Sequence, residues 1–412
     1  MHILFLTDNF PPETNAPASR TFDHCVEWVK RKDCKVTVIT CFPNFPKGEI
    51  FPGYKNRLFK IENISGINVI RVWSYIAANH GTFKRILDYI SFMVASFIAS
   101  FFVRKVNVVI GTSPQFFTVC SAYAVSVVKR IPWIFELRDI WPESIKAVEA
   151  IKENIVISLL EKIELFLYRK ATKIVSVTHT FRNILVKRGI DNSKIEVITN
   201  GVDLKHFKPL QKDSKLLEKL GLKDKFIAGY IGTHGMAHGL EVIIDAAVIA
   251  NKKRDFQEVH FLLLGDGSEK SNLLTKADSL GLTNISFIDS VAKDEVHRYW
   301  SILDASIIHL KSRPIFETVI PSKIFECMAM GIPILHGVRG ESLEIVQSLN
   351  AGISFQPENP IDLIGAIAKL KNDPSLREHY RNSAIEGSKN YDRIQLSRRM
   401  LHVISEVTRS GI

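Results

Sequence analysis

Short runs of apolar and β-branched residues alternate along the chain with longer stretches in which apolar positions recur at helical spacing. This alternation is typical of repeated βαβ units with parallel sheets. In the first half the expected strands are Ile3–Thr7, Lys35–Cys41, Asn68–Trp73, Val106–Gly111, Trp133–Leu137, Lys173–Val177 and Ile195–Ile198. In the second half they are Phe226–Ile231, Val259–Leu264, Asn284–Ile288, Ala305–His309 and Ile332–Leu335. The pattern therefore predicts an α/β protein.

A turn-rich segment, Asn200-Gly201-Val202-Asp203, and a polar stretch up to Asp224 separate the two series of strands. The 412 residues also exceed what one hydrophobic core usually covers. We therefore predict two Rossmann-like, doubly wound domains, residues 1–204 and 205–388, facing each other across a cleft. A last helical pattern, Tyr391–Thr408, lies in the remaining segment 389–412.

One segment departs from the alternation. Ile86–Val103 contains a single charged residue, Asp88, and lies between the basic pairs Lys84-Arg85 and Arg104-Lys105. Its length, roughly 18 residues, is at the threshold for a membrane span. A buried helix under the first sheet and a helix in the membrane interface with basic ends on lipid phosphates both fit this pattern. A span fits least, because it would divide a βαβ domain.

The composition, 46% apolar and 24% charged, excludes a disordered or collagen-like chain. The formal charge of +11 is unevenly distributed, since residues 1–205 contain 28 Lys and Arg against 18 Asp and Glu. We therefore expect the first domain to meet an anionic partner. No basic and aromatic pattern of a known nucleic-acid module is present, so we expect no nucleic acid. Five cysteines without metal-ligand spacing, and an apolar start that is too short for a signal peptide, predict a cytoplasmic protein.

Loops at the carboxyl ends of parallel strands are the candidate ligand sites. The chain has no GxxxxGK[ST] motif, and its nearest match to GxGxxG, at Gly265-Asp266-Gly267, has Lys270 in place of the third glycine. Two glycine loops suit phosphate binding instead: Gly232-Thr233-His234-Gly235, followed by His238, and Gly265–Gly267. A plain strand-to-helix turn explains such loops about as well.

The stretch from Pro321-Ser322-Lys323 to Gly331-Ile332-Pro333 is the most informative. A helix is expected to begin near Ser322, with Lys323 in its first turn. A cation there opposes the helix dipole unless an anion lies nearby. Glu326, on the same helix, has a carboxylate that could accept two ribose hydroxyls.

These residues together resemble the nucleotide-sugar glycosyltransferases of the GT-B fold, in particular the retaining family 4. The resemblance extends over nearly the whole chain and depends on Phe10-Pro11-Pro12-Glu13 with Arg20, Asn200–Asp203, Gly232–Glu241, Leu264–Gly267 and Lys323–Pro333. Bacterial surface-polysaccharide enzymes, such as N-acetyl-L-fucosamine transferases, have a similar Glu136-Leu137-Arg138-Asp139-Ile140-Trp141-Pro142 and Pro321-Ser322-Lys323.

The sequence departs from the family pattern in two places. The family has Glu, seven residues and Glu, and the first of these falls on Thr318, with Glu317 one position away. Many members also have Arg and Lys on the loop after the first strand of the second domain, where this chain has Thr233, His234 and His238. Lys323, His238 and backbone amides would then bind more of the diphosphate.

The resemblance implies transfer of a sugar, such as N-acetyl-L-fucosamine, from a nucleoside diphosphate, expected to be UDP, with retention at the anomeric carbon. The implied donor-binding residues are Gly232, Thr233, His234, Gly235, His238, Gly265, Asp266, Gly267, Pro321 and Ser322. The catalytic candidates are Lys323, Glu326, Asp139 and Arg138, and the residues expected at the acceptor or cleft are Glu13, Asn15, Arg20 and His80. A structural ion pair is an alternative for Arg138 and Asp139. The catalytic base is left open.

Amides and Lys323 suit the charge that develops on the leaving diphosphate, and the chain has no Asp-x-Asp. No metal and no cofactor are therefore expected. The resemblance also implies that the helix in 389–412 returns towards the N-terminal domain.

The basic first domain suits a polyprenyl-diphosphate-linked saccharide at the inner face of the cytoplasmic membrane, where anionic lipid attracts Lys and Arg. This favours a peripheral enzyme of O-antigen or capsule synthesis. Two alternatives stay open: an isomerase similar to the UDP-N-acetylglucosamine 2-epimerases, and a non-catalytic membrane-associated scaffold.

Overall fold

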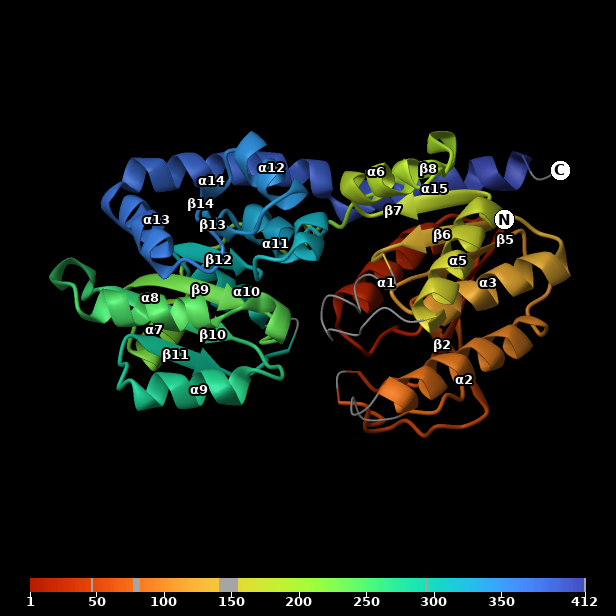
Figure 1. Ribbon diagram of the computed structural model, residues 1–412, viewed down its shortest axis with the longest axis horizontal. Coiled ribbons are helices and arrows are strands. Elements are labelled where there is room, and N and C mark those ends of the chain that lie inside the picture. Colours follow the sequence, from red (N-terminus) through yellow and green to blue (C-terminus); the bar gives the residue numbers. More distant parts are fainter. Residues whose placement is uncertain (46, 77–81, 141–154, 293–294, 411–412) are drawn as a thin grey trace. The chain divides into compact units, whose positions relative to one another are not determined.

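The computed structural model describes residues 1–45, 47–76, 82–140, 155–292 and 295–410. The chain forms two compact units, which we call unit 1 (residues 1–199 and 393–412) and unit 2 (residues 200–392) (Figure 1). Each unit is built on a largely parallel sheet with helices packed against it. The predicted fold class, two Rossmann-like α/β domains, is confirmed.

In unit 1 the strands are ordered β3-β4-β2-β1-β5-β6-β7-β8 across the sheet, and β3 is antiparallel to β4. The strands are β1 (His2–Leu6), β2 (Lys35–Cys41), β3 (Phe59–Ile64), β4 (Ile67–Val72), β5 (Val108–Thr112), β6 (Trp133–Leu137), β7 (Lys173–Ser176) and β8 (Ile195–Val197). The helices are α1 (Ala16–Val29), α2 (Thr82–Ser100), α3 (Phe116–Lys129), α5 (Ile155–Lys170), α6 (His179–Lys187) and α15 (Arg393–Ser410), with a 3-10 turn at Asn192–Lys194.

In unit 2 the order is β11-β10-β9-β12-β13-β14, with parallel pairing throughout the described strands. The strands are β9 (Phe226–Ile231), β10 (Val259–Leu264), β11 (Ile285–Ile288), β12 (Ala305–His309), β13 (Ile334–Gly337) and β14 (Gly352–Ser354). The α-helices are α7 (Ser214–Leu220), α8 (Glu241–Asn251), α9 (Lys270–Ser279), α10 (Val296–Ser301), α11 (Lys323–Met330), α12 (Glu341–Ser348), α13 (Pro360–Asn372) and α14 (Pro374–Ser388). Shorter 3-10 turns are Met236–His238, Arg254–Phe256, Pro314–Thr318 and Lys389–Tyr391.

Every predicted strand is present, with its ends shifted by two residues or fewer. The pattern missed β3 and β14, which lie at edges of the sheets. β3 alternates apolar and charged residues and is largely exposed, so it lacks the continuous apolar run of a central parallel strand. It pairs with β4 through a two-residue turn in which Ser65 and Gly66 both have positive φ, as a tight hairpin requires.

The core of unit 1 depends on its last helix. On α15, Leu396, Met400 and Ile404 are buried in one cluster with Phe5 and Trp28. The indole N–H of Trp28 donates to the carbonyl of Ser397 at 2.9 Å, which fixes α15 against α1. The C-terminal segment therefore completes the core that the N-terminal strand begins.

The apolar segment of the first half forms α2, which lies beside α3 and also contacts β2 and β4 (Figure 1). The helix is only partly covered, because Ile86, Ile90, Val94 and Ile98 remain exposed. Within the described ranges, no helix has the length and hydropathy that a membrane crossing needs.

Replacing Ile404 by Ala tests the dependence of unit 1 on α15. Ile404 is fully buried, so I404A should lower the free energy of unfolding by about 3 kcal/mol, measured by urea unfolding. The matched control is H402A on the same helix, where the side chain is 76% exposed and an effect within about 0.5 kcal/mol is expected. Equal effects of the two changes would contradict the packing described here.

Candidate functional site

In the unit 2 sheet the strands after β9 are added first on one side, as β10 and β11, and then on the other side, as β12, β13 and β14, so the strand order reverses at β9. β9 has β10 on one side and β12 on the other, so the loops after β9 and β12 diverge there. In open α/β sheets this reversal leaves a crevice at the carboxyl ends of the strands, where ligands bind. The sequence-predicted glycine loops and the helix that begins at Lys323 all lie at this edge.

The two glycine loops interlock through their backbones. The amide of Gly232 donates to the carbonyl of Leu264, and the amide of His234 donates to Asp266, both at 2.9 Å. Gly265 has a φ of +146°, and a Cβ at this position would lie 1.9 Å from the carbonyl oxygen of Gly232. The glycine at 265 therefore has a structural reason that needs no ligand.

Lys323 is the first residue of α11, and its ammonium lies against the first of these loops. Its Nζ has practically no accessible surface and no hydrogen-bonding partner among the described residues. It lies 3.7 Å from the centroid of the Tyr230 ring, a cation–π contact. A Cβ on Gly232 would come within 2.5 Å of Nζ, so a side chain at position 232 would displace the ammonium from this place. Burial lowers the pKa of Lys323 to about 7, against the opposing effect of the Cys327 and Glu326 charges.

Two histidines lie beside this lysine. His234 is fully buried, and neither ring nitrogen has a hydrogen-bonding partner among the described residues. Burial, with Lys270 and Lys323 adding to it, lowers the pKa of His234 to about 4. Burial and then Lys323 lower the pKa of His238 to about 3. Both imidazoles are therefore neutral at pH 7, and each neutral ring can donate one N–H.

The backbone of His238 is fixed by a third histidine that the sequence analysis missed. Nε2 of His309 accepts from the amide of Glu358 at 2.8 Å, so Nδ1 is the protonated nitrogen and donates to the carbonyl of His238 at 2.7 Å. Because His309 ends β12, this pair of bonds ties the loop after β9 to the neighbouring strand.

The other predicted donor-binding residues lie around this group. Thr233 is exposed, and its carbonyl accepts from the Tyr230 hydroxyl at 2.8 Å. Gly235 precedes the short 3-10 turn that contains His238, and the exposed Asp266 accepts from the amide of Gly267 at 2.8 Å.

Pro321 and Ser322 lead into α11, and Ser322 makes no side-chain cap. Glu326 is partly buried in the first turn of the same helix. Thr318, at the position where the family pattern has a glutamate, donates to the carbonyl of Ile315 at 2.7 Å within a 3-10 turn.

Tyr230 and Lys270 were also missed. Lys270 is the first residue of α9, and its Nζ donates to the carbonyl of Gly265 at 2.9 Å and pairs with Asp289 at 2.5 Å. A cation in the first turn of a helix is the signal that singled out Lys323, and it was equally present at Lys270.

In unit 1, Glu13 ties two loops together. Its carboxylate accepts from the amides of Phe10 at 3.1 Å, Asn44 at 2.9 Å and Phe45 at 2.8 Å. Burial raises its pKa to about 7, although these hydrogen bonds act in the opposite direction. Asn15 is the N-cap of α1 and accepts from the amide of Ala18 at 2.9 Å.

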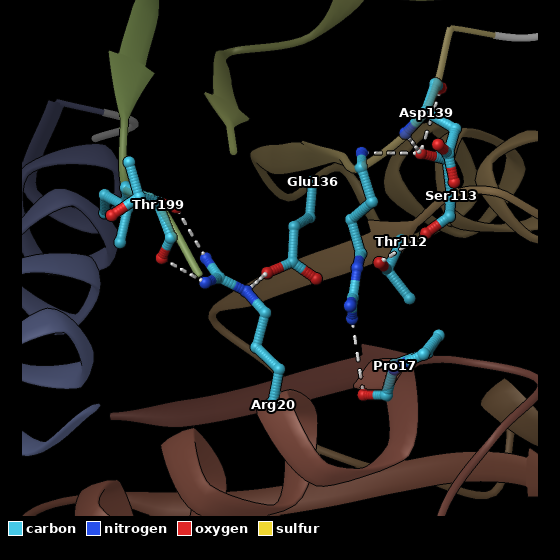
Figure 2. Close-up of polar contacts among 9 residues, drawn as sticks. Pro17, Arg20, Thr112, Ser113, Glu136, Asp139 and Thr199 are labelled. Carbon is cyan, nitrogen blue, oxygen red and sulfur yellow. Dashed lines mark hydrogen bonds and ion pairs between the residues drawn. The ribbon is translucent and has the colours of Figure 1, made fainter. Parts of the chain in front are cut away.

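Arg20 joins three elements of unit 1. Figure 2 shows its guanidinium between the carboxylate of Glu136, 3.0 Å from Nε, and the carbonyl of Thr199, 2.6 Å from Nη1. Nη2 donates to the carbonyl of Ile198 at 2.9 Å. These bonds hold α1 against the ends of β6 and β8.

Arg138 and Asp139 follow β6 and share one hydroxyl partner. The amide of Arg138 donates to Oγ of Ser113 at 2.8 Å. The amide of Asp139 donates to the same oxygen at 3.3 Å (Figure 2). Burial raises the pKa of Asp139 to about 6 and lowers that of Arg138 to about 10. Burial also raises the pKa of Asp8, which the charge of Arg138 opposes. The structure thus brings a guanidinium and two carboxyl groups together at the carboxyl edge of this sheet.

His80 lies outside the described residues. Within the part of the chain that the structure describes, no group of three or more His, Cys, Asp or Glu side chains is arranged to hold a metal ion.

A lysine that is buried without an anion should destabilise the free protein. The pKa of Lys323 is about 7 in the folded chain, whereas an unburied lysine, as in the unfolded chain, has a pKa of 10.5. Below pH 7 the lysine is charged in both the folded and the unfolded chain, so the full cost of burying the charge lowers the free energy of unfolding. This cost decreases as the pH rises from 7 towards 10.5, because the folded chain then holds the neutral amine. K323M should raise the free energy of unfolding, and the gain should be about 2 to 3 kcal/mol larger at pH 6 than at pH 9.

Urea unfolding at the two pH values measures this difference. K270M is the matched control, because Lys270 already has an ion-pair partner and its removal should give no gain. A gain for K323M that does not change with pH would contradict the assigned burial of the charge.

Each half of the chain matches a family model of its own. The model described as "Glycosyltransferase Family 4" matches residues 18–206, and the one described as "Glycosyl transferases group 1" matches residues 212–387. Both describe transferases, and neither describes an epimerase or a scaffold.

Curated relatives agree with these models. The chain is 24% identical over 339 residues to WcaI of Escherichia coli (strain K12), a protein assigned to glycosyl transfer in colanic acid biosynthesis, with 80% of this chain and 82% of WcaI covered. It is 23% identical to TuaH of Bacillus subtilis (strain 168), assigned to glycosyl transfer in teichuronic acid biosynthesis, with 61% and 62% covered.

Solved structures show the same fold. HepE of Anabaena, crystallised with UDP-glucose, is 18% identical with a TM-score of 0.74, covering 98% of this chain and 100% of HepE. Sucrose-phosphate synthase from Thermosynechococcus elongatus is 14% identical with a TM-score of 0.80, covering 99% of both chains. With two matching domain models and this fold, the chain is a glycosyltransferase with a GT-B fold of the group 1 and family 4 type.

Proposed function

We propose that the enzyme transfers a sugar from a nucleoside diphosphate, with UDP as the nucleotide, to a polyprenyl-diphosphate-linked saccharide in the synthesis of a surface polysaccharide such as O-antigen or capsule. The donor binds to unit 2 and the acceptor to unit 1. Transfer proceeds without a metal ion and with retention at the anomeric carbon, and the sugar is an N-acetylated amino sugar such as N-acetyl-L-fucosamine. The enzyme acts at the inner face of the cytoplasmic membrane.

The observation that supports donor binding is the Lys323 ammonium, which has no hydrogen-bonding partner among the described residues. A buried cation without an anion is unfavourable in the free protein, and a diphosphate would supply the missing charge. The ammonium also lies beside the Gly232 loop, at the edge of the sheet where ligands of such folds bind. The UDP complexes of HepE, a structural neighbour, support the choice of nucleotide.

Leaving-group stabilisation follows from this arrangement. As the bond between the sugar and the diphosphate breaks, negative charge grows on the phosphate oxygen. Lys323, prepositioned by the Tyr230 ring, supplies a fixed positive charge, and the neutral rings of His234 and His238 can donate N–H groups. Such donors act without reorganisation at the moment of reaction. Glu326 would accept the ribose hydroxyls.

The acceptor side depends on unit 1. The sequence up to residue 205 has a net charge of +10, which favours a diphosphate-linked acceptor. Asp139, with a pKa of about 6, and Arg138 lie at the carboxyl edge of the sheet, where the acceptor hydroxyl would be oriented. The relatives WcaI and TuaH, assigned to colanic acid and teichuronic acid biosynthesis, support a surface polysaccharide as product.

Ligand binding and turnover test the proposal together. UDP-, GDP- and ADP-sugars are screened for a rise in melting temperature, and UDP-N-acetylamino sugars should give the largest rise. The stabilising sugar is then incubated with a polyprenyl-diphosphate-linked saccharide in the presence of EDTA, and products are analysed by mass spectrometry. A lipid-linked product with the sugar added is expected. Epimerised donor without transfer, or turnover that EDTA abolishes, would contradict the proposal.

Donor affinity should fall as the pH rises. Lys323 has a pKa of about 7 in the free protein and binds the diphosphate in its charged form, so binding above pH 7 requires proton uptake. The dissociation constant of the donor should therefore increase about tenfold between pH 6 and pH 8. Isothermal titration calorimetry with a UDP-sugar measures it.

K323M is the control for this pH dependence. It should bind the donor weakly at both pH values, because it has no proton to lose at this position. A tenfold change that persists in K323M would assign the titration to another group.

A further inference from the structure

An open apolar groove of about 670 Å³ lies in unit 1, and none of the predicted site residues lines it. Its floor is the β3–β4 hairpin, where Phe59 faces Val72 and Ile61 faces Ile70 in register. Its wall is one stripe of α2. The stripe residues are Ser91, Val94, Ala95, Ile98 and Ala99, which recur at i, i+3, i+4, i+7 and i+8, and Phe102 extends the wall just beyond the end of the helix.

The groove is an uncovered apolar surface. Leu58 is 82% exposed, Phe59 65% and Phe102 81%, although all three are large hydrophobic residues. Contiguous apolar patches of this kind on a protein surface mark sites of interaction. A partner of this surface must itself be largely apolar.

The polar groups of the lining are few and largely used. The hydroxyl of Ser91 donates to the carbonyl of Asp88 at 2.8 Å and accepts from the amide of Tyr75 at 2.7 Å. A polar ligand or a peptide backbone would lose hydrogen bonds to water on entering such a groove. A hydrocarbon chain loses none.

The segment that forms the groove is strongly basic. Residues 55–105 contain eight Lys and Arg but only two acidic residues, Glu62 and Asp88. Glu62 is already paired with Lys60 and Arg71. Burial raises the pKa of Asp88 to about 7. The surroundings of the groove therefore favour a ligand that combines a hydrocarbon chain with phosphate.

One end of the groove lies at the carboxyl edge of the unit 1 sheet, where the acceptor is proposed to bind. The end of β4 at Val72 and the start of β3 at Phe59 lie at the carboxyl edge of the sheet, because β4 is parallel to β2. Arg71 of this hairpin donates through its guanidinium to the carbonyls of Cys41 and Pro11. One end of the groove therefore lies at this carboxyl edge, and Arg71, on the other face of β4 from the groove residues Ile70 and Val72, ties the same edge to the loop that contains Glu13.

We propose that this groove binds the isoprenoid chain of the lipid-linked acceptor, with its phosphate groups directed towards the carboxyl edge of the unit 1 sheet. This inference rests on the proposed function, since it assumes a polyprenyl acceptor. The inference adds to the proposed function a binding site for the isoprenoid chain, which differs from contact of the protein with a bilayer surface.

Farnesyl diphosphate is a water-soluble probe for this site, and Trp73 in the lining is a built-in reporter, 40% exposed. When farnesyl diphosphate is titrated into the protein, the tryptophan emission should shift to shorter wavelength. The W73F variant should show little of this shift. Isopentenyl diphosphate, with the same diphosphate and a much shorter chain, should bind at least tenfold more weakly. Equal affinity for the two probes, or no binding of farnesyl diphosphate, would overturn the proposal.

Exposed groove residues allow variants that should fold normally. The double variant V94Q/I98Q should weaken farnesyl diphosphate binding at least fivefold, whereas V128Q, at a residue of α3 that is 52% exposed and outside the groove, should leave it unchanged. Binding of a UDP-sugar to V94Q/I98Q should equal that of the parent protein, which shows that unit 2 is intact. Unchanged farnesyl diphosphate binding in V94Q/I98Q would overturn the proposal.

Two further measurements separate the other possible occupants. If V94Q/I98Q loses binding to phosphatidylglycerol vesicles but keeps farnesyl diphosphate, the surface contacts a bilayer and the proposal is wrong. If the parent protein is a dimer that V94Q/I98Q dissociates, by sedimentation, the surface binds a second copy and the proposal is wrong. Farnesyl diphosphate binding in the groove without transfer to any lipid-linked saccharide would instead contradict the proposed function alone.

Discussion

The ammonium of Lys323 is the constraint on which the candidate site of unit 2 depends. Removed from water and without a hydrogen-bonding partner among the described residues, it is held by the Tyr230 ring and by the space that Gly232 leaves. Burial lowers its pKa to about 7. The free protein thus holds an ammonium with an unmet demand for negative charge, which is a reason for an anionic ligand to bind there.

The surrounding backbone preserves that position. The loops after β9 and β10 interlock through Gly232, His234 and Gly265, and His309 fixes the carbonyl of His238. Gly232 and Gly265 are therefore needed for the packing of these two loops. The same packing holds the neutral imidazoles of His234 and His238 beside the lysine.

Unit 1 is organised differently. Its polar residues at the carboxyl edge hold its own elements together: Glu13 accepts from the backbone amides of two loops, and Arg20 joins α1 to β6 and β8. Its uncovered surface is apolar instead, between α2 and the β3–β4 hairpin, within a segment of net positive charge. Part of the positive charge of the first half of the chain therefore belongs to the segment that forms this apolar surface.

The sequence by itself determined the α/β class, the two domains, nearly all strand positions and the place of Lys323 in the first turn of a helix. These features depend on local periodicity and on helix ends, which are readable from neighbouring residues. Only the tertiary structure decided that Tyr230 and His309 support the site, that Gly265 is required by Gly232, and that the apolar helix leaves a groove beside β3. These features are contacts between residues distant in sequence, and no local pattern specifies which side chains meet.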